Sequence, residues 1–279
     1  MRMGGAAGGD RGLSGREAGT VGTGGMDTWA ERLATELEGA VGRALEGTAE
    51  AGVAFSGGID SALVALLAAR KGVDMRLYTA GLPGAADLLA SLKAARALGL
   101  GDRLSVLELR ADEVRQAAAR IRALVPGAAL LEVSYLAPAF LVFGRAAEQR
   151  ILTGDGADEL FGGYHRYLSM GPAELAASLE TDARELLSSG FGRNRRLAAA
   201  FGKQVAAPYL DPRVVDMARQ IPADLKVRAG ERKAVLRRAA ALLGLPPELC
   251  ALPKRAAQYG SGIFALLKKE RYMQERGVQ

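Results

Sequence analysis

The stretch that decides the fold is Gly52-Val53-Ala54-Phe55-Ser56-Gly57-Gly58-Ile59-Asp60-Ser61. Its small and apolar residues 52–55 predict a short buried strand, and the following run from about 61 to 70 predicts a helix. The adjacent glycines let the backbone turn sharply and present N–H groups outward. A helix N-terminus adds its positive dipole end at the same place, so the whole unit is suited to cradling phosphate oxygens.

The polar residues of this turn fit the same purpose. Gly57 and Gly58 are expected to bring backbone N–H groups close to phosphate, and Ser56 and Ser61 can add hydroxyl donors. Asp60 would repel phosphate directly, so we expect it to bind a Mg²⁺ ion that bridges to the phosphates. The G-x-x-x-x-G-K-[ST] pattern of the Walker P-loop occurs nowhere in the chain.

Outward from this turn, strand patterns alternate with helix patterns. Strands are expected at 52–55, 75–79, 103–109 and 150–153, and helices at 28–45, 61–70, 86–98, 111–124 and 135–148. After Tyr164 strand signals vanish and the rest is expected to be helical. The alternation predicts an α/β fold, doubly wound, with a mostly parallel sheet and a helical C-terminal part from about residue 165.

Domain organisation follows from the same patterns. The glycine-rich residues 1–26 hold few large apolar side chains, so we expect a disordered tail. Residues 27–265 are expected to form one domain and 266–279 a C-terminal tail. The longest apolar runs are too short to cross a bilayer, and no secretory signal is evident, so the cytoplasm is the expected location.

Composition excludes several kinds of chemistry. A single cysteine, Cys250, leaves no internal disulfide framework and no multi-cysteine zinc site. One histidine, His165, excludes histidine-cluster metal sites and argues against a Ser-His-Asp mechanism. The net charge of +6 could attract RNA or a triphosphate, or simply reflect a solvated surface. Its arginine blocks lack interleaved aromatics, so nucleic-acid binding is not expected.

A second cluster of chemical interest runs from Thr153 to Tyr164, as Thr-Gly-Asp-Gly-Ala-Asp-Glu-Leu-Phe-Gly-Gly-Tyr. Its three carboxylates repel one another, so a protein keeps them close mainly to hold a cation or to tune a proton acceptor. They follow the end of a predicted strand, which is where ligands bind in open α/β sheets.

These two stretches carry a resemblance to a known family. The Ser56–Ser61 turn resembles the S-G-G-x-D-S loop of the N-type ATP pyrophosphatases, which cleave ATP between its α and β phosphates. The Thr153–Tyr164 segment resembles the signature of asparagine synthetases and their β-lactam-forming relatives. The resemblance covers about 50–265 and implies the synthetase domain of such an enzyme without its glutamine-hydrolysing domain.

By position, this resemblance implies roles for several residues. Asp158 would be the second magnesium ligand, beside Asp60, and Asp155 would help to deprotonate the attacking amine. Thr153 and Gly154 would line the AMP moiety. Asp155 is one methylene shorter than the glutamate found in many asparagine synthetases.

Three further stretches fit the same family. Ala80 and Gly81 are candidates to contact adenine through their backbones. Lys233 and Lys254 would hold pyrophosphate and stabilise the charge that develops at the reacting carboxyl group, although Arg255 could align in place of Lys254. Leu252 stands where the family usually has an arginine.

The resemblance implies an ATP-dependent amide ligase that uses Mg-ATP, a carboxylate such as the side chain of aspartate, and ammonia. The ammonia would come from solution or from a separate glutaminase subunit. Open alternatives are a β-lactam-forming or other amide ligase, a tRNA-modifying enzyme, and a non-catalytic nucleotide-binding regulatory partner.

Overall fold

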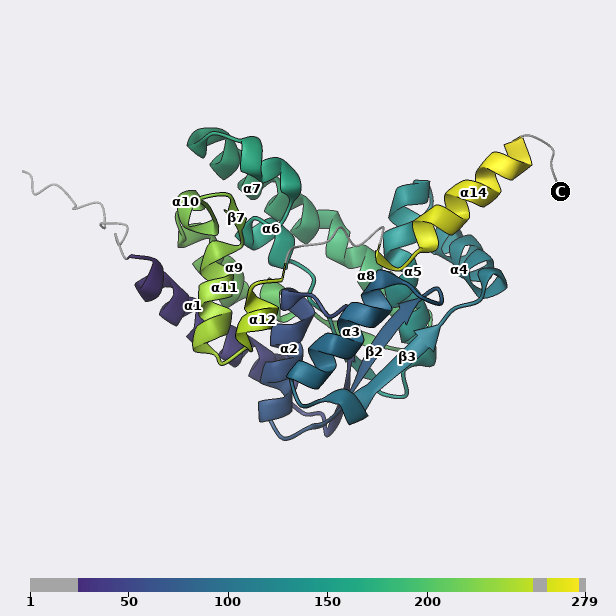
Figure 1. Ribbon diagram of the computed structural model, residues 1–279, viewed down its shortest axis with the longest axis horizontal. Coiled ribbons are helices and arrows are strands. Elements are labelled where there is room, and N and C mark those ends of the chain that lie inside the picture. Colours follow the sequence, from purple (N-terminus) through teal and green to yellow (C-terminus); the bar gives the residue numbers. More distant parts are fainter. Residues whose placement is uncertain (1–24, 253–259, 276–279) are drawn as a thin grey trace, which may run out of the picture.

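The computed structural model describes residues 25–252 and 260–275, and its centre is a five-stranded sheet in which every strand pair is parallel (Figure 1). The strands lie in the order β3-β2-β1-β4-β5. Their bounds are Glu50–Ala54 (β1), Asp74–Gly81 (β2), Leu104–Glu108 (β3), Arg150–Leu152 (β4) and Gln204–Ala206 (β5). The predicted α/β class and parallel sheet are therefore confirmed.

The path of the chain through this sheet reverses once. From β1 it moves outward to β2 and β3 through the helices α2 (Ile59–Arg70) and α3 (Ala86–Ala97). It then returns through α4 (Ala111–Leu124) and α5 (Leu130–Arg145) to β4, which pairs with the other side of β1. The carboxyl ends of β1 and β4 thus flank the point where strand order reverses, which is where open α/β sheets bind ligands.

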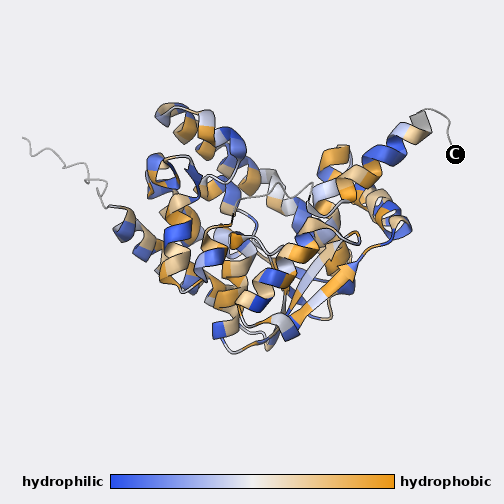
Figure 2. Ribbon diagram, viewed as in Figure 1, coloured by the Kyte–Doolittle hydropathy of each residue, from blue (hydrophilic) through white to orange (hydrophobic). Residues whose placement is uncertain are grey.

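Two apolar cores cover the two faces of the sheet. Val53 and Leu77 contribute to one core with α1 (Met26–Ala44) and α2, whereas Tyr78 and Ile151 contribute to the other with α4 and α5. This alternation along the strands follows from their two-residue period. Figure 2 shows the resulting pattern, with helices that carry both hydrophilic and hydrophobic residues around the strands.

The C-terminal half is mostly helical, as predicted. Its helices are α6 (Ala157–Phe161), α7 (Pro172–Glu185), α8 (Phe191–Ala199), α9 (Pro212–Gln220), α10 (Ala223–Lys226), α11 (Ala234–Leu242), α12 (Pro247–Cys250) and α14 (Ile263–Glu275). No helix in the described ranges is long and apolar enough to cross a membrane.

Strands also occur where the sequence indicated none. Beyond Tyr164, β5 extends the main sheet beside β4, and Val227–Arg228 (β6) pairs antiparallel with Glu231–Arg232 (β7). These strands have two or three residues each, too few to show an alternating apolar pattern. Backbone pairing with a neighbour, and not side-chain periodicity, defines them.

The predicted tail boundary at 265 falls inside a helix. Helix α14 begins at Ile263, and the side chains of Ile263 and Leu267 are buried in the core that α4 and α5 share. The described part of the C-terminal segment is therefore helical, and its first turns contribute to that core. The expectation of disorder for the N-terminal tail falls, apart from 25 and 26, outside the described residues.

Candidate functional site

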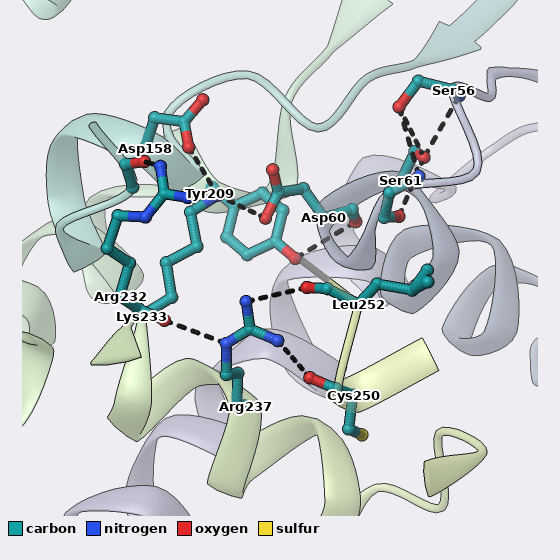
Figure 3. A network of polar contacts seen from close by, with 12 residues as sticks. Ser56, Asp60, Ser61, Asp158, Tyr209, Arg232, Lys233, Arg237, Cys250 and Leu252 are labelled. Atoms are coloured by element: carbon teal, nitrogen blue, oxygen red, sulfur yellow. Dashed lines mark hydrogen bonds and ion pairs between the residues drawn. The ribbon is translucent and has the colours of Figure 1, made fainter. Parts of the chain in front are cut away.

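Two acidic side chains from distant parts of the chain meet around one lysine. Asp60 lies in the first turn of α2 and Asp158 in the first turn of α6. The Nζ atom of Lys233 lies 2.6 Å from an oxygen of each carboxylate. Lys233 precedes α11 and is fully buried, at 0% exposure. Figure 3 shows its ammonium group between the two carboxylates.

Glycines and a tyrosine permit this close arrangement. A Cβ atom on Gly163 would lie 1.8 Å from Asp158 Oδ1 and 2.4 Å from Lys233 Cε, so no larger residue fits there. A Cβ atom on Gly154 would lie 3.1 Å from that of Asp60. The hydroxyl of Tyr209 donates to the carbonyl of Asp60 at 3.1 Å and fixes the start of α2 from the far side.

The serines of the turn after β1 bond to each other and to the turn itself. Their hydroxyls lie 3.2 Å apart, and Ser61 Oγ also donates to the carbonyl of Gly58 at 3.2 Å. Gly57 has φ +73°, and a Cβ atom there would lie 2.6 Å from the backbone of α3 at Ala90. The first glycine thus allows the turn to pack against α3, while both serines line a cavity.

Asp155 lies on the wall of the same cavity and accepts two hydrogen bonds at one oxygen. Thr153 Oγ1 donates to its Oδ2 at 2.8 Å, and Asn194 Nδ2 donates to the same atom at 2.7 Å. Desolvation raises the pKa of Asp155, which the two hydrogen bonds partly oppose. A carboxylate in this setting is a better proton acceptor than one in water.

The cavity has a volume of about 800 Å³ and opens between the sheet and the helical half. Its lining includes the carboxyl ends of β1 and β4, the first turns of α2 and α6, and parts of α5 and α8. Tyr164 donates a hydrogen bond to Glu159, whose pKa is also raised by burial. His165, for which no role was expected, lies on the wall.

The sequence profile of the family described as asparagine synthase matches residues 32–177 and 168–275. The two matches together take in the sheet, the acidic pair and the lysine between them. The chain belongs to the asparagine synthase family.

Several curated relatives of this family are similar over part or most of the chain. "Putative asparagine synthetase [glutamine-hydrolyzing] 1" of Methanocaldococcus jannaschii is 28% identical over 88% of this chain and 53% of its own length. The chicken (Gallus gallus) "Asparagine synthetase [glutamine-hydrolyzing]" is 27% identical over 87% and 45%. Mouse (Mus musculus) "Asparagine synthetase domain-containing protein 1" is 37% identical over 44% and 21%. The chain thus spans about half the length of the first two.

The acidic pair fits the magnesium ion that asparagine synthases are expected to use. Oδ1 of Asp60 and Oδ1 of Asp158 both lie 2.6 Å from the ammonium of Lys233, so the two carboxylates face the same region and would be the residues that hold the ion. No cluster of three or more acidic, histidine or cysteine ligands occurs in the described part of the chain. Mg²⁺ is commonly held by one or two carboxylates together with phosphate and water, and Asp60 and Asp158 supply two carboxylates.

Two groups of predicted site residues stand apart from the cavity. Ala80 and Gly81 end β2, and Gly81 accepts a hydrogen bond from the N–H of Leu109 at 2.9 Å. Neither residue lines the cavity formed by the described residues. Lys254, and Arg255 as its alternative, lie outside the described residues.

Three site residues had no signal in the sequence. Asn194 lies among arginines that predict no site, and Tyr209 lies in a segment that carried no site prediction. The guanidinium of Arg237 donates to the carbonyls of Cys250 and of Leu252, the latter at 3.0 Å. A backbone carbonyl as partner leaves no trace in the residue types, which explains why Tyr209 and Arg237 were missed.

Proposed function

We propose that this chain is an ATP-dependent amide ligase that adenylates a carboxylate, with the side chain of aspartate as substrate and asparagine as product. The observation that carries the proposal is the meeting of Asp60 and Asp158, whose carboxylates contact the same lysine ammonium, beside the Ser56–Ser61 turn. Membership of the asparagine synthase family supports the same chemistry.

The first step of the proposed reaction forms the activated acid. A carboxylate oxygen of the substrate attacks the α phosphorus of ATP, the bond to the β-phosphate oxygen breaks, and pyrophosphate leaves. The turn after β1, with the dipole of the 12-residue helix α2, is suited to binding the phosphates. Mg²⁺ held by Asp60 and Asp158 would supply charge neutralisation at these phosphates, and Lys233 adds a fixed ammonium beside them.

The second step forms the amide. The amine attacks the carbonyl carbon of the acyl-adenylate, AMP leaves, and the amine loses a proton. Asp155 is suited to accept that proton because burial raises its pKa above that of an ordinary aspartate. Lys254 is proposed to stabilise the negative charge that develops at the reacting carboxyl group. Thr153 and Gly154 are proposed to lie along the AMP moiety.

Product analysis tests the proposal. The protein is incubated with Mg-ATP, aspartate and an ammonium salt, and the nucleotide products are separated. We expect AMP and pyrophosphate in equal amounts, together with asparagine. A panel of other acids, with hydroxylamine to trap any acyl-adenylate as a hydroxamate, checks the substrate.

Each of the other outcomes would point to a different function. ADP and inorganic phosphate would contradict the adenylation chemistry. AMP formation with another acid but not aspartate would retain the ligase and reject the substrate. Nucleotide binding with no turnover of any acid in the panel would favour a regulatory partner. Hydroxylamine reacts directly with an acyl-adenylate, so a missing source of ammonia could not explain that outcome.

A further inference from the structure

Asn194 brings helix α8 to the acidic cavity. It lies within α8 (Phe191–Ala199), 39 residues beyond Asp155, and its amide donates to Asp155 Oδ2 at 2.7 Å. We propose that Asn194 is a positioning residue for amide formation, which orients the carboxylate of Asp155 so that its other oxygen faces the attacking amine. This inference rests on the proposed function and assigns a step-specific role within it.

The geometry of the two donors supports a role in orientation. Thr153 follows β4 and Asn194 lies on α8, far apart in the sequence, yet both donate to Oδ2 of Asp155. In the described ranges, no hydrogen bond to Oδ1 of Asp155 accompanies them. The terminal torsion of an aspartate is broad and roughly two-fold, so two donors on one oxygen select one orientation of the group. The remaining oxygen is left for the cavity that Asp155 lines.

Asn194 is itself held in place by its neighbours on α8. The next turn of the helix buries Leu197 and Ala198 completely in the core beside α5. On the other side, Arg193 forms an ion pair with Glu132 of α5 at 2.8 Å. The amide is therefore carried on a helix that is fixed at two points, which makes it a rigid support for Asp155.

The chemical type of the donor also matters. A lysine or arginine here would pair with Asp155, favour its ionised form and lower its pKa. A neutral amide donates a hydrogen bond without adding a charge. Asp155 therefore stays oriented and keeps the raised pKa that burial gives it, which suits a proton acceptor. The Oδ1 atom of Asn194 is buried and accepts no hydrogen bond from the described residues.

The test separates the two chemical steps. In Asn194→Leu, which keeps the size and removes the donor, we expect the rate of pyrophosphate formation in a single turnover, with protein in excess over ATP, to stay within about threefold of the parent protein. The rate of asparagine formation in the same single turnover, with ammonium as the amine, should fall by roughly tenfold or more, because general-base contributions are of this order or larger. Asn194→Gln, which keeps the donor, should recover part of the loss.

A matched control lies next in the sequence. Arg195 is exposed on the same helix and does not line this cavity, so Arg195→Ala should leave both single-turnover rates unchanged. If Asn194→Leu does not fold, Asn194→Ser serves the same purpose with a smaller change.

Two results would overturn the positioning role. Equal losses in the single-turnover rates of pyrophosphate and asparagine formation would show that Asn194 only supports the fold or the first step, and no change in either rate would show that Asp155 needs no such support. If the parent protein released no pyrophosphate with any acid, the proposed function would itself be refuted, and this inference with it.

Discussion

Lys233 is the residue on which the acidic site depends. Its buried ammonium lies 2.6 Å from oxygens of both Asp60 and Asp158. Its backbone has φ +59°, a conformation that residues other than glycine rarely adopt. A protein retains such a residue where the surrounding contacts outweigh the strain. The two carboxylates also lie close to each other, so their mutual repulsion is relieved by this cation.

Replacing Lys233 therefore should be costly. We expect Lys233→Met to lower the free energy of unfolding by about 3–5 kcal/mol, because two half-buried carboxylates lose the charge between them. The measurement is urea denaturation followed by circular dichroism.

A second buried lysine provides the matched comparison. Lys226 is 6% exposed, and burial lowers its pKa to about 8. Because the folded pKa lies below the unfolded value of 10.5, the stability of the parent protein should rise as pH increases between these values. Lys226→Met should raise stability at pH 7 and abolish that rise. Equal losses of stability in the two methionine variants would contradict the difference in their surroundings.

The raised pKa of Asp155 predicts that folding stability depends on pH in the opposite direction. Because burial raises its pKa, the unfolded chain ionises this group at a lower pH than the folded protein does. Its contribution to stability is therefore lost as pH rises from the ordinary aspartate pKa to the raised one. Asp155→Asn should raise the melting temperature at pH 8 and change it little at pH 3. A variant that is less stable than the parent at pH 8 would argue against the desolvated carboxylate.

At the scale of elements, the turn between β1 and α2 is fixed by contact with α3. Gly57 combines φ +73° with a position where a Cβ atom would lie 2.6 Å from backbone atoms of Ala90 and Ser91. Gly72 has nearly the same φ, +74°, and open space around it. A comparison of the two glycines therefore separates the cost of the left-handed backbone from the cost of steric contact.

Substitution of each glycine by alanine measures the two effects. Gly72→Ala should cost about 1–2 kcal/mol of stability through its left-handed backbone alone. Gly57→Ala should cost clearly more, since the backbone of α3 or the turn must also shift. It should weaken ATP binding as well, which isothermal titration calorimetry would measure. Similar losses of stability for both variants would show that the turn does not depend on its packing against α3.

The sequence predicted most elements of the α/β half because each carried a local signal. Strand and helix patterns placed α1 to α4 and β1 to β4 within a few residues of their observed bounds, and the turn predicted from the glycines lies between β1 and α2. Helix α5 was expected from 135 and begins at Leu130. Strand β5, by contrast, has three residues whose pairing with β4 is set by tertiary contacts.

The site was predictable where its residues lie in a motif. Asp60 and Asp158 each stand in a glycine-rich stretch, and the structure brings them together. That Lys233 lies between them could not be read from spacing, because the helical half had to fold back over the sheet. Asn194 reaches Asp155 by the same long-range packing, which no local pattern encodes.

At the scale of the whole molecule, the helical half closes the site over the carboxyl edge of the sheet. Lys233 reaches the acidic pair from the N-terminus of α11, Tyr209 from the turn before α9, and Asn194 from α8. The last helix, α14, packs against α4 and α5, and Figure 1 shows it at the opposite end of the molecule from α1.

The packing of α14 predicts that this helix belongs to the folded unit. Ile263 is fully buried, so Ile263→Ala should lower the free energy of unfolding by about 2–5 kcal/mol. Lys268, which is exposed on the same helix, provides the control, and Lys268→Ala should change stability little. A small effect of both substitutions would indicate that this segment is a tail that does not stabilise the folded domain.

The proposed reaction requires Asp60 and Asp158 to bind one magnesium ion together beside the nucleotide. Isothermal titration calorimetry tests this through the affinity for ATP, with and without Mg²⁺, in the parent protein and in Asp158→Asn. We expect Mg²⁺ to tighten ATP binding by about tenfold or more in the parent and to have little effect in the variant. The same gain from Mg²⁺ in both proteins would refute the shared magnesium site.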